Sequence, residues 1–511
     1  DVSYLYRIIG KRISRSGSRA FSLCIITIST VANRAIEEVW CDNVLLGWLT
    51  LDSCTVAIGF QWNYQQGKLE GGCNEHLFGP VQSKFHKQVE ALKQLDAGEG
   101  DNDDSQNNDA DKPPVTANAK CAKEHVICKF TPVKGDIKTS EIFASTNVEK
   151  CSAPVVHQMT HHVLNQIPSY GLHAAGISVD AAGPNWSAFR ASSTHSASDF
   201  LPIRLMKQYP HIDFTIKHIM LTALGKPFIF CADNMHLFKA VVTCMYNSSS
   251  KYSKRYLMCG RCPISLGMVE IVYRATGGGT NQMQPTKLND EVFFRDSRSK
   301  MNCHRNLVVL SNSVKRMLEA AIYDDTVEFR PFNNKHVFWP LVHFIGHFNE
   351  LVDITNGRDR DYYTPQNGEA KQIKLLNLLE WFSKWKMNHD AAVEDEDSSK
   401  TKYNFFAAET WECIQILILS HVTVIQLYCL ERGFTVNPRT LCTDTVEQHF
   451  GNSKQHHGGS RQGLTVQQMN NADTTAGVVN DSYWGLVGNN KRSRKSDGTE
   501  TELITKKRKK F

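Results

Sequence analysis

The sequence of 511 residues has little of what marks several special classes of protein. Charged residues make up 22 % and hydrophobic residues 41 %, a balance that excludes a wholly disordered, collagen-like or coiled-coil protein. The 15 cysteines are scattered singly, which excludes a disulfide framework and favours a reduced, intracellular protein. Lys and Arg number 58 against 52 Asp and Glu, too small an excess to indicate a nucleic-acid partner by itself. The sequence therefore predicts a folded, soluble protein of roughly two to four domains.

Targeting signals, repeats and membrane spans are also scarce. The first residue is Asp1 and no signal peptide follows it, so we expect a fragment that lacks its native N-terminus. No internal repeat of fixed period occurs, which excludes solenoids and propellers. The longest apolar stretch, Cys413 to Leu430, contains His421 and Gln426, whose polar groups would be costly in lipid. This stretch is predicted to be a buried helix, and no membrane association is expected.

Two internal segments and the C-terminus contain few apolar residues. Residues 97–114 are acidic and cannot bury enough surface to offset the entropy of ordering, so they are predicted to be a disordered loop. Residues 391–402 have a similar composition and are predicted to mark a domain junction. Residues 476–511 form a polar tail whose basic clusters, 491–495 and 506–510, resemble a bipartite nuclear-localisation signal. A nuclear location is expected, and a solvated basic tail without an address function is the alternative.

Apolar runs and helical spacing alternate between these segments. Strands are predicted at 45–52, 55–62, 125–130, 172–180 and 227–233, and a helix at 154–166. Strands that first pair as a meander and then alternate with helices are typical of an α/β sheet. From about residue 252 to 387 the pattern is mainly helical, with the clearest helices at 308–321, 337–351 and 372–385. The sequence thus predicts an α/β domain and a second, helical domain.

Three of the predicted strands end in an aspartate, namely Asp52, Asp180 and Asp233. Ligands and catalytic groups collect at strand ends in open α/β sheets, because the strand holds the backbone while the side chain faces the crevice. A single Asp after a strand is more often a helix N-cap or a turn residue. Asp444 and Glu447 lie three residues apart, on one face if their segment is helical. These carboxylates are the candidates for a shared site.

Four motifs surround these acids. They are Leu49-Thr50-Leu51-Asp52 followed by Gly67-Lys68-Leu69-Glu70-Gly71, Gly176-Ile177-Ser178-Val179-Asp180 with Asn185, Asp233-Asn234-Met235-His236, and Asp444-Thr445-Val446-Glu447 with Phe450-Gly451. In these motifs and their order the chain resembles, from about Tyr4 to Met469, the P element-type DNA transposases, which include relatives with a THAP-type zinc finger. The resemblance implies an RNase H-like core whose catalytic and metal-binding triad is Asp52, Asp180 and Glu447. It places Asp233 and His236 beside that triad; a satisfied turn with a packed histidine is the alternative for this pair.

The chemistry of DNA cleavage and strand transfer suits such a triad. A water or a 3′ hydroxyl attacks phosphorus while the opposite oxygen leaves, and two divalent ions about 3.5–4 Å apart can stabilise both oxygens. Carboxylate oxygens are the ligands that suit Mg²⁺ or Mn²⁺. We therefore expect a DDE-type transposase that forms no covalent enzyme intermediate.

The interval between Asp180 and Glu447 is longer than a bare RNase H-like core requires. The family inserts a mainly α-helical domain there that binds guanine nucleotide, so the resemblance implies GTP as a cofactor. A carboxylate can accept two hydrogen bonds from the edge of guanine, a pairing that adenine cannot offer. An Asn and an Asp four residues apart are also typical of a solvated helix face, and no Walker-type phosphate loop is present. The residues implied to bind the nucleotide are Lys287, Asn349, Asp353 and Asp444.

The resemblance divides the chain into five segments. They are a remnant of an N-terminal helical region (1–44), the first part of the RNase H-like core (45–250), the helical nucleotide-binding domain (251–402), the last part of the core with the catalytic Glu (403–475) and the basic tail (476–511). The family's N-terminal zinc finger and coiled coil are not found. The expected partners are DNA at transposon ends and targets, guanine nucleotide and a second copy of the chain.

The chain departs from the family pattern at several positions. Ser53 stands where the family has Glu, and Asn234-Met235 replace a pair that contains Pro. None of these changes removes a triad carboxylate. The alternatives to an active transposase are a catalytically silent nuclear DNA-binding or scaffold protein derived from one, and an unrelated α/β nuclear protein.

Overall fold

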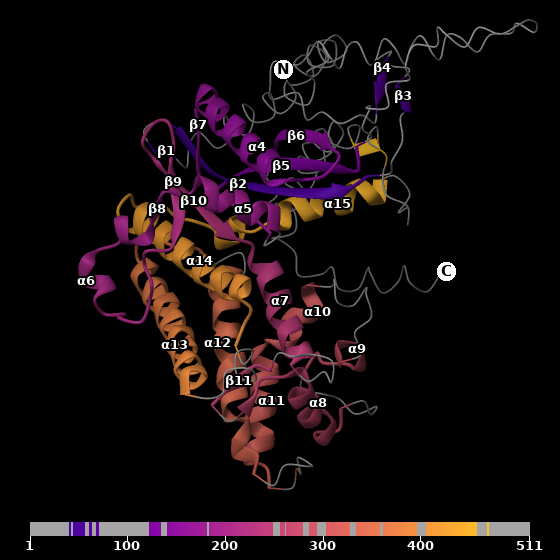
Figure 1. The fold of residues 1–511 in the computed structure, drawn as a ribbon, viewed down its shortest axis with the longest axis vertical. Coiled ribbons are helices and arrows are strands. Elements are labelled where there is room, and N and C mark those ends of the chain that lie inside the picture. Colours follow the sequence, from indigo (N-terminus) through magenta and orange to yellow (C-terminus); the bar gives the residue numbers. More distant parts are fainter. Residues whose placement is uncertain are drawn as a thin grey trace, which may run out of the picture.

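The computed structural model describes a mixed sheet and a set of helices (Figure 1). The residues described are 40–41, 44–56, 61–63, 68–70, 122–133, 141–180, 183–248, 256–260, 262–278, 286–293, 303–325, 327, 334–357, 361–395, 405–456, 465 and 468–469. The predicted loop at 97–114, the basic tail at 476–511 and nearly all of the N-terminal remnant at 1–44 lie outside the described residues.

The sheet combines an antiparallel meander with two parallel strands. Its order is β6-β5-β2-β7-β10-β9-β8, and β1 pairs with β2. β2 pairs antiparallel with β5 and parallel with β7, which pairs parallel with β10. The strands are β1 (Trp40–Cys41), β2 (Val44–Thr55), β5 (Glu124–Pro132), β6 (Glu141–Val148), β7 (Leu172–Val179), β8 (His195–Ser196), β9 (Lys217–Leu221) and β10 (Pro227–Ala232). Three antiparallel strands followed by two parallel ones are consistent with the predicted RNase H-like core.

The central strands approach closely because of one glycine and one tryptophan. A Cβ at Gly176 of β7 would lie 2.2 Å from the Ile229 carbonyl oxygen and 2.4 Å from the Trp48 ring, so only glycine fits there. The fully buried Trp48 on β2 donates from Nε1 to Ser178 Oγ at 2.9 Å. This buried hydrogen bond fixes β2 beside β7, the strand that Asp180 follows.

Helices cover both faces of the sheet (Figure 1). Side chains alternate along β5, so its neighbouring residues face opposite sides of the sheet. Val126 and Cys128 belong to the main core, which α4 (Ala153–Gln166) also lines. Ile127 packs in a second cluster with Val446 and Phe450 of α15 (Asp444–His456). α5 (Gly183–Ser192) packs against α4. The predicted helical segment around Glu447 is confirmed as α15, on the face opposite to α4.

A mainly helical region follows the sheet in the chain. α7 (Asn234–Asn247) leaves the end of β10, and α14 (Ala408–Val424) returns beside it. Between them lie β11 (Met258–Cys259), β12 (Cys262–Pro263), α8 (Leu266–Ala275), α9 (Asp290–Phe293), α10 (Cys303–Val309), α11 (Asn312–Tyr323), η6 (Lys335–Phe338), α12 (Trp339–Thr355) and α13 (Gly368–Asp395). The remaining short elements are β3 (Gln61–Asn63), β4 (Lys68–Glu70), η3 (Ile167–Tyr170), η4 (Ala197–Asp199), α6 (Ile203–Met206), η8 (Ile425–Leu430) and η9 (Pro438–Leu441).

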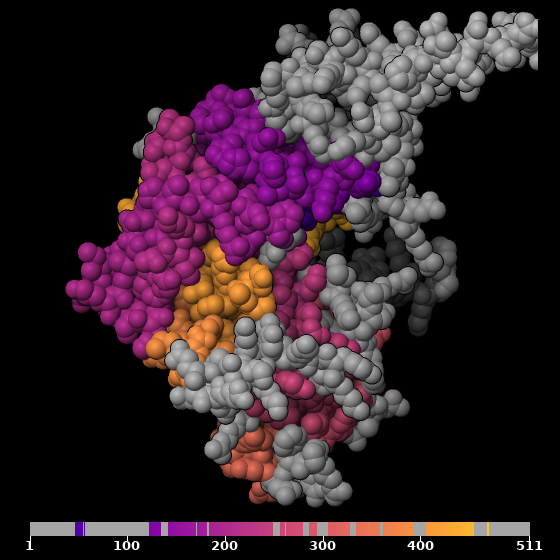
Figure 2. Space-filling model, viewed as in Figure 1, coloured from indigo at the N-terminus to yellow at the C-terminus, as the bar shows by residue number. Residues whose placement is uncertain are grey.

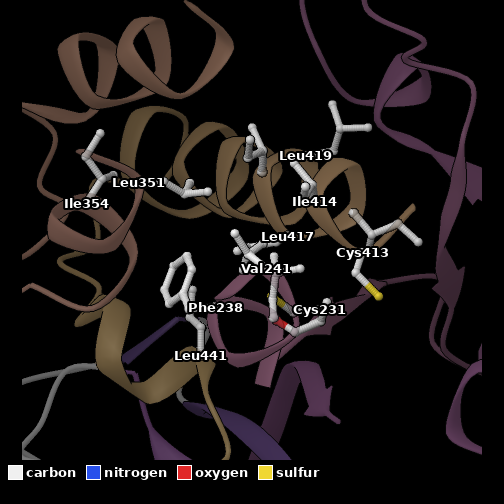
Figure 3. Close-up of a cluster of buried hydrophobic side chains, with 14 of the residues drawn as sticks. Cys231, Phe238, Val241, Leu351, Ile354, Cys413, Ile414, Leu417, Leu419 and Leu441 are labelled. Carbon is white, nitrogen blue, oxygen red and sulfur yellow. The ribbon is translucent and has the colours of Figure 1, made fainter. Parts of the chain in front are cut away.

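α14 and the π-helix η8 together form the apolar helix that joins the two regions. The helix Ala408–Leu430 is long and apolar enough to cross a membrane, because an 18-residue stretch of it has a mean hydropathy of 1.9. However, 89 % of that stretch is buried inside the protein. Its side chains Ile414 and Leu417 lie over Val241 of α7, with Leu351 of α12 to their left (Figure 3). In the space-filling view, the orange segment of α14 shows between the magenta sheet region and the coral helical region (Figure 2). The predicted buried helix is confirmed.

Several predicted boundaries are wrong. The strand predicted at 55–62 does not form as one unit, because β2 continues to Thr55 and residues 61–63 pair with β4 instead. The helix predicted at 308–321 is broken at Ser311, which stands at the N-cap position of α11 after the end of α10. α13 continues to Asp395, so the first part of the predicted junction at 391–402 is helical. The strands β6, β8 and β9 were not predicted.

Candidate active site at the ends of the central strands

Asp52 and Asp180 lie at the same edge of the sheet. Asp52 is near the carboxyl end of β2, and Asp180 directly follows β7. The two strands are parallel, and Thr50 is paired with Ser178. Asp52 and Asp180 each lie two residues after a member of this pair, so they stand opposite each other. The Ser53 backbone N–H donates to Asp52 Oδ1 at 2.7 Å, and the Asn185 side-chain amide donates to Asp180 Oδ1. The strands thus hold two carboxylates side by side.

The sheet also anchors the start of α15, which carries Glu447. Thr50 Oγ1 of β2 lies 3.1 Å from Thr445 Oγ1, and Lys129 Nζ of β5 donates to the Thr445 carbonyl oxygen at 3.4 Å. These contacts hold the first turn of α15 against the strand of Asp52. The Glu447 side chain remains 40 % exposed, so it is accessible to a ligand.

Asp233 and His236 connect this edge of the sheet to α15. Asp233 is 1 % exposed and caps α7, since its Oδ2 accepts from the His236 backbone N–H and lies 2.8 Å from His236 Nδ1. Its Oδ1 accepts from the Thr443 backbone N–H at 2.8 Å. His236 Nε2 lies 3.5 Å from Glu447 Oε1. The histidine therefore bridges Asp233 and Glu447.

The close packing of these charges shifts their pKa values. Burial and the charges of Asp180 and Glu447 raise the pKa of Asp52 to about 7. Burial also raises the pKa of Glu447, with Asp233 and Asp444 acting in the same direction. Burial alone would lower the pKa of His236, but its hydrogen bond to Asp233 and the charge of Glu447 raise it to about 9. The site is a set of mutually repelling carboxylates with one partly compensating histidine.

Asp52→Asn is expected to stabilise the metal-free protein at pH 8 by about 4 kcal/mol. The pKa of Asp52 is about 7 in the folded protein and 3.8 in the unfolded chain. Between pH 3.8 and pH 7 the folded protein therefore binds more protons at Asp52 than the unfolded chain does, so the free energy of unfolding falls as the pH rises. The amide removes that loss. Urea unfolding in EDTA at pH 8 and at pH 3.5 measures the effect, which should vanish at the lower pH. Equal differences at both pH values would contradict it.

The carboxylates at this edge of the sheet are of the kind that divalent cations bind. A cation would relieve the repulsion that raises the pKa of Asp52, and three carboxylates supply the oxygen ligands that Mg²⁺ and Mn²⁺ prefer. Among the described residues, no three His, Cys, Asp or Glu side chains are already grouped closely enough to hold a metal ion. Glu447 lies against His236 instead, and its side chain would have to turn to join the two aspartates.

The residues predicted to bind nucleotide lie in three places. Asn349 and Asp353 are one turn apart on α12, where Asn349 Nδ2 donates to Asp353 Oδ2 and Asn349 Oδ1 accepts from the Asn312 backbone N–H, both at 2.8 Å. The exposed Lys287 precedes α9. Asp444 begins α15 among the site carboxylates, and burial together with the charge of Asp233 raises its pKa. Asn349 thus caps α11 in addition to any role toward a ligand.

Sequence reasoning missed the residues that hold the site together. Thr443, Thr445 and Lys129 make the contacts that place α15, and none carries a spacing signal in the sequence. Their partners lie between 210 and 395 residues away. Asn185, which the sequence analysis named in one motif with Asp180, donates a hydrogen bond to Asp180 Oδ1.

Comparison with known proteins identifies the fold. No model of a known protein family matches the chain, and no curated protein matches it. A solved structure described as the Drosophila P element transposase strand transfer complex is similar, with a TM-score of 0.58, 11 % sequence identity and coverage of 88 % of this chain and 80 % of that chain. At this identity the similarity concerns the fold. The chain therefore has a mixed α/β fold similar to that of the Drosophila P element transposase.

Proposed function

We propose that the chain is a P element-like DNA transposase that cleaves DNA at transposon ends and transfers the strands with Mg²⁺ or Mn²⁺. The observation that carries this proposal is the position of Asp52, Asp180 and Glu447. Two of these carboxylates lie at or near the carboxyl ends of adjacent parallel strands, and the third lies in the first turn of the helix anchored beside them. The similarity of fold to the Drosophila P element transposase supports it.

The three carboxylates would hold the ions at the sheet edge. Bound there, a pair of divalent ions would stabilise the attacking and the leaving oxygens of the displaced phosphate. Asp52 must give up its proton to bind a cation, which its pKa of about 7 allows near neutral pH. Asn185 orients Asp180, and His236 faces Glu447. Because water or a 3′ hydroxyl is the nucleophile, no side chain has to form a bond to phosphorus.

The alternative function is that of a catalytically inactive, transposase-derived nuclear protein that binds DNA or acts as a scaffold. The observation that favours it is the contact between Glu447 and His236, which engages the third carboxylate of the proposed triad. A protein of this kind would bind DNA without cleaving it.

A cleavage assay on DNA with candidate transposon ends distinguishes the two functions. The purified chain is incubated with labelled DNA in Mg²⁺ or Mn²⁺ and in EDTA, and the products are resolved on a denaturing gel. The proposal predicts nicked or transferred strands only when metal is present. If neither the chain nor its fusion to a related zinc-finger domain yields a product while both still bind DNA, the inactive alternative holds.

We further propose that GTP binds at α12, in the helical region between the two parts of the core. The support is the resemblance together with the paired side chains of Asn349 and Asp353. Asp353→Ala is expected to weaken GTP binding at least about tenfold, because it removes an acceptor for the guanine edge. Isothermal titration with GTP and ATP measures this, with Glu350→Ala on the same helix as the control. Equal affinity for both nucleotides would contradict a guanine site.

The remaining partner and the cellular location of the chain are proposals that follow from the family resemblance and from the basic clusters of the sequence. The basic clusters at 491–495 and 506–510 would direct the chain to the nucleus, and a second copy of the chain would pair the two transposon ends. Deletion of residues 491–510 from a fluorescently tagged chain tests the first of these.

A further inference from the structure

One lysine lies on the same face of α7 as the histidine that contacts Glu447. His236 Nε2 lies 3.5 Å from Glu447 Oε1, and the half-buried Lys239 follows His236 by three residues. Residues three apart lie on one face of a helix, so Lys239 leaves α7 on the side of Glu447. Side chains on a helix also lean toward its N-terminus, which for Lys239 is the turn that carries His236. An ammonium group therefore lies at the rim of the carboxylate edge.

The charge of Lys239 acts on Glu447. Burial raises the pKa of Glu447, whereas the charge of His236 and, to a smaller extent, that of Lys239 lower it. The interaction between two charges weakens with distance, so a lysine that favours the ionised carboxylate lies near it. The position of Lys239 on the helix and its electrostatic effect therefore agree.

A DNA strand that approaches this edge of the sheet meets mainly negative charge. Asp52, Asp180 and Glu447 lie there, and DNA carries one negative charge per phosphate, so the carboxylates repel it. His236 offsets little of this repulsion, because its ring is already hydrogen-bonded to Asp233. A second cation beside Glu447 would let a phosphate approach the edge.

The face of α7 that carries Lys239 has small side chains and lies outside the core. Ala240 and Thr243 follow Lys239 there, both half-buried, and Thr243 donates its hydroxyl to the Lys239 carbonyl oxygen at 2.8 Å. On the opposite side of α7, Leu237 and Phe238 are buried in the main core. Lys239 thus stands on the outer side of the helix, where a lysine can keep its charged head in water or against a ligand.

We infer that Lys239 binds a backbone phosphate of DNA next to the carboxylates and so holds the strand at the catalytic edge. This inference rests on the proposed function, and it names a side chain through which the proposed site takes hold of its substrate. A lysine suits the role, because an ammonium binds phosphate as a point charge. A phosphate contact positions the strand without reading its sequence, so it adds affinity for DNA of any sequence.

Binding of DNA to the full chain in EDTA tests the inference without a metal ion. The affinity for a fluorescently labelled duplex is measured by anisotropy over a series of salt concentrations. Lys239→Gln is expected to reduce the salt dependence of log affinity by about 0.9, which is about an eightfold loss of affinity at about 0.1 M salt. Lys239→Arg keeps the charge and should bind like the wild type. The matched control is Lys374→Gln on α13, which removes an exposed lysine that pairs with Glu350 and should leave the salt dependence unchanged.

Acylation of lysines in the wild-type chain, followed by mass spectrometry, locates the contact without any substitution. Bound DNA is expected to protect Lys239 severalfold and to leave Lys374 as reactive as before. A Lys239 that stays reactive in the complex, unchanged binding by Lys239→Gln, or an equal loss from Lys374→Gln would overturn the inference. A wild-type chain that binds no DNA would instead contradict the proposed function.

Discussion

Glu447→Gln is expected to reduce metal-dependent DNA cleavage at least about a thousandfold, equivalent to about 4 kcal/mol in the activation barrier. The amide has nearly the same shape as the carboxylate but carries no charge, so its oxygen is a much weaker ligand for a divalent cation. Because Glu447 is 40 % exposed, the change leaves the core intact. The rate of product formation from end-labelled DNA in Mg²⁺ measures the effect, and circular dichroism checks that the fold is kept.

Two further variants make this result specific. Asp52→Asn is expected to have the same effect, whereas Glu270→Gln on α8, where the carboxylate pairs with Arg274, should cleave like the wild type. If Glu447→Gln retains more than a tenth of the wild-type rate, Glu447 is not a metal ligand and the proposed triad is wrong.

Asp233→Ala is expected to lower the free energy of unfolding by about 3 kcal/mol or more. The fully buried carboxylate accepts from the backbone of Thr443 and from the backbone and ring of His236, so its removal leaves buried donors without a partner. It also releases the start of α15 from the end of β10. The midpoint of urea unfolding, followed by tryptophan fluorescence, measures this loss.

The control for Asp233 is another capping aspartate in a different environment. Asp199 accepts from the Ser196 backbone N–H at 2.8 Å at an exposed turn, so Asp199→Ala should cost only about 1 kcal/mol. The loss of unfolding free energy in Asp233→Ala should also depend on pH. Although burial raises the pKa of Asp233, its hydrogen bonds lower it below the usual value, so this stabilisation is present above about pH 4 and is lost in acid. A similar loss from both variants would show that Asp233 is an ordinary cap.

The parts of the fold that were predictable are those with strong local patterns. The strands β7 and β10 are continuous apolar runs followed by Asp, and α14 is an apolar run whose His421 favours the protein interior over lipid. The strand β9 has only three buried residues, and its place is set by pairing with β10, which no local pattern encodes. The break at Ser311 was missed because helical periodicity continues on both sides of it.

The candidate site was predictable in its carboxylates but not in its connections. Asp52, Asp180 and Glu447 stand in recognisable motifs, whereas the bond from Thr443 to Asp233 joins residues 210 positions apart. The sequence left open whether Asp233 and His236 belong to the site or to a satisfied turn. In the structure Asp233 caps α7, while the ring it holds reaches Glu447. Long-range hydrogen bonds of this kind depend on the final packing, so spacing along the chain could not reveal them.

Anomalous scattering from Mn²⁺ in crystals of the chain tests the central claim most directly, because it locates the ions without any knowledge of the DNA target. The account predicts one or two manganese peaks bound by Asp52 and Asp180, with Glu447 turned away from His236 to join them. Loss of the peaks in Glu447→Gln crystals would complete that result. Manganese found elsewhere, with Glu447 still against His236 at saturating Mn²⁺, would contradict the metal-dependent transposase and leave the inactive, DNA-binding alternative.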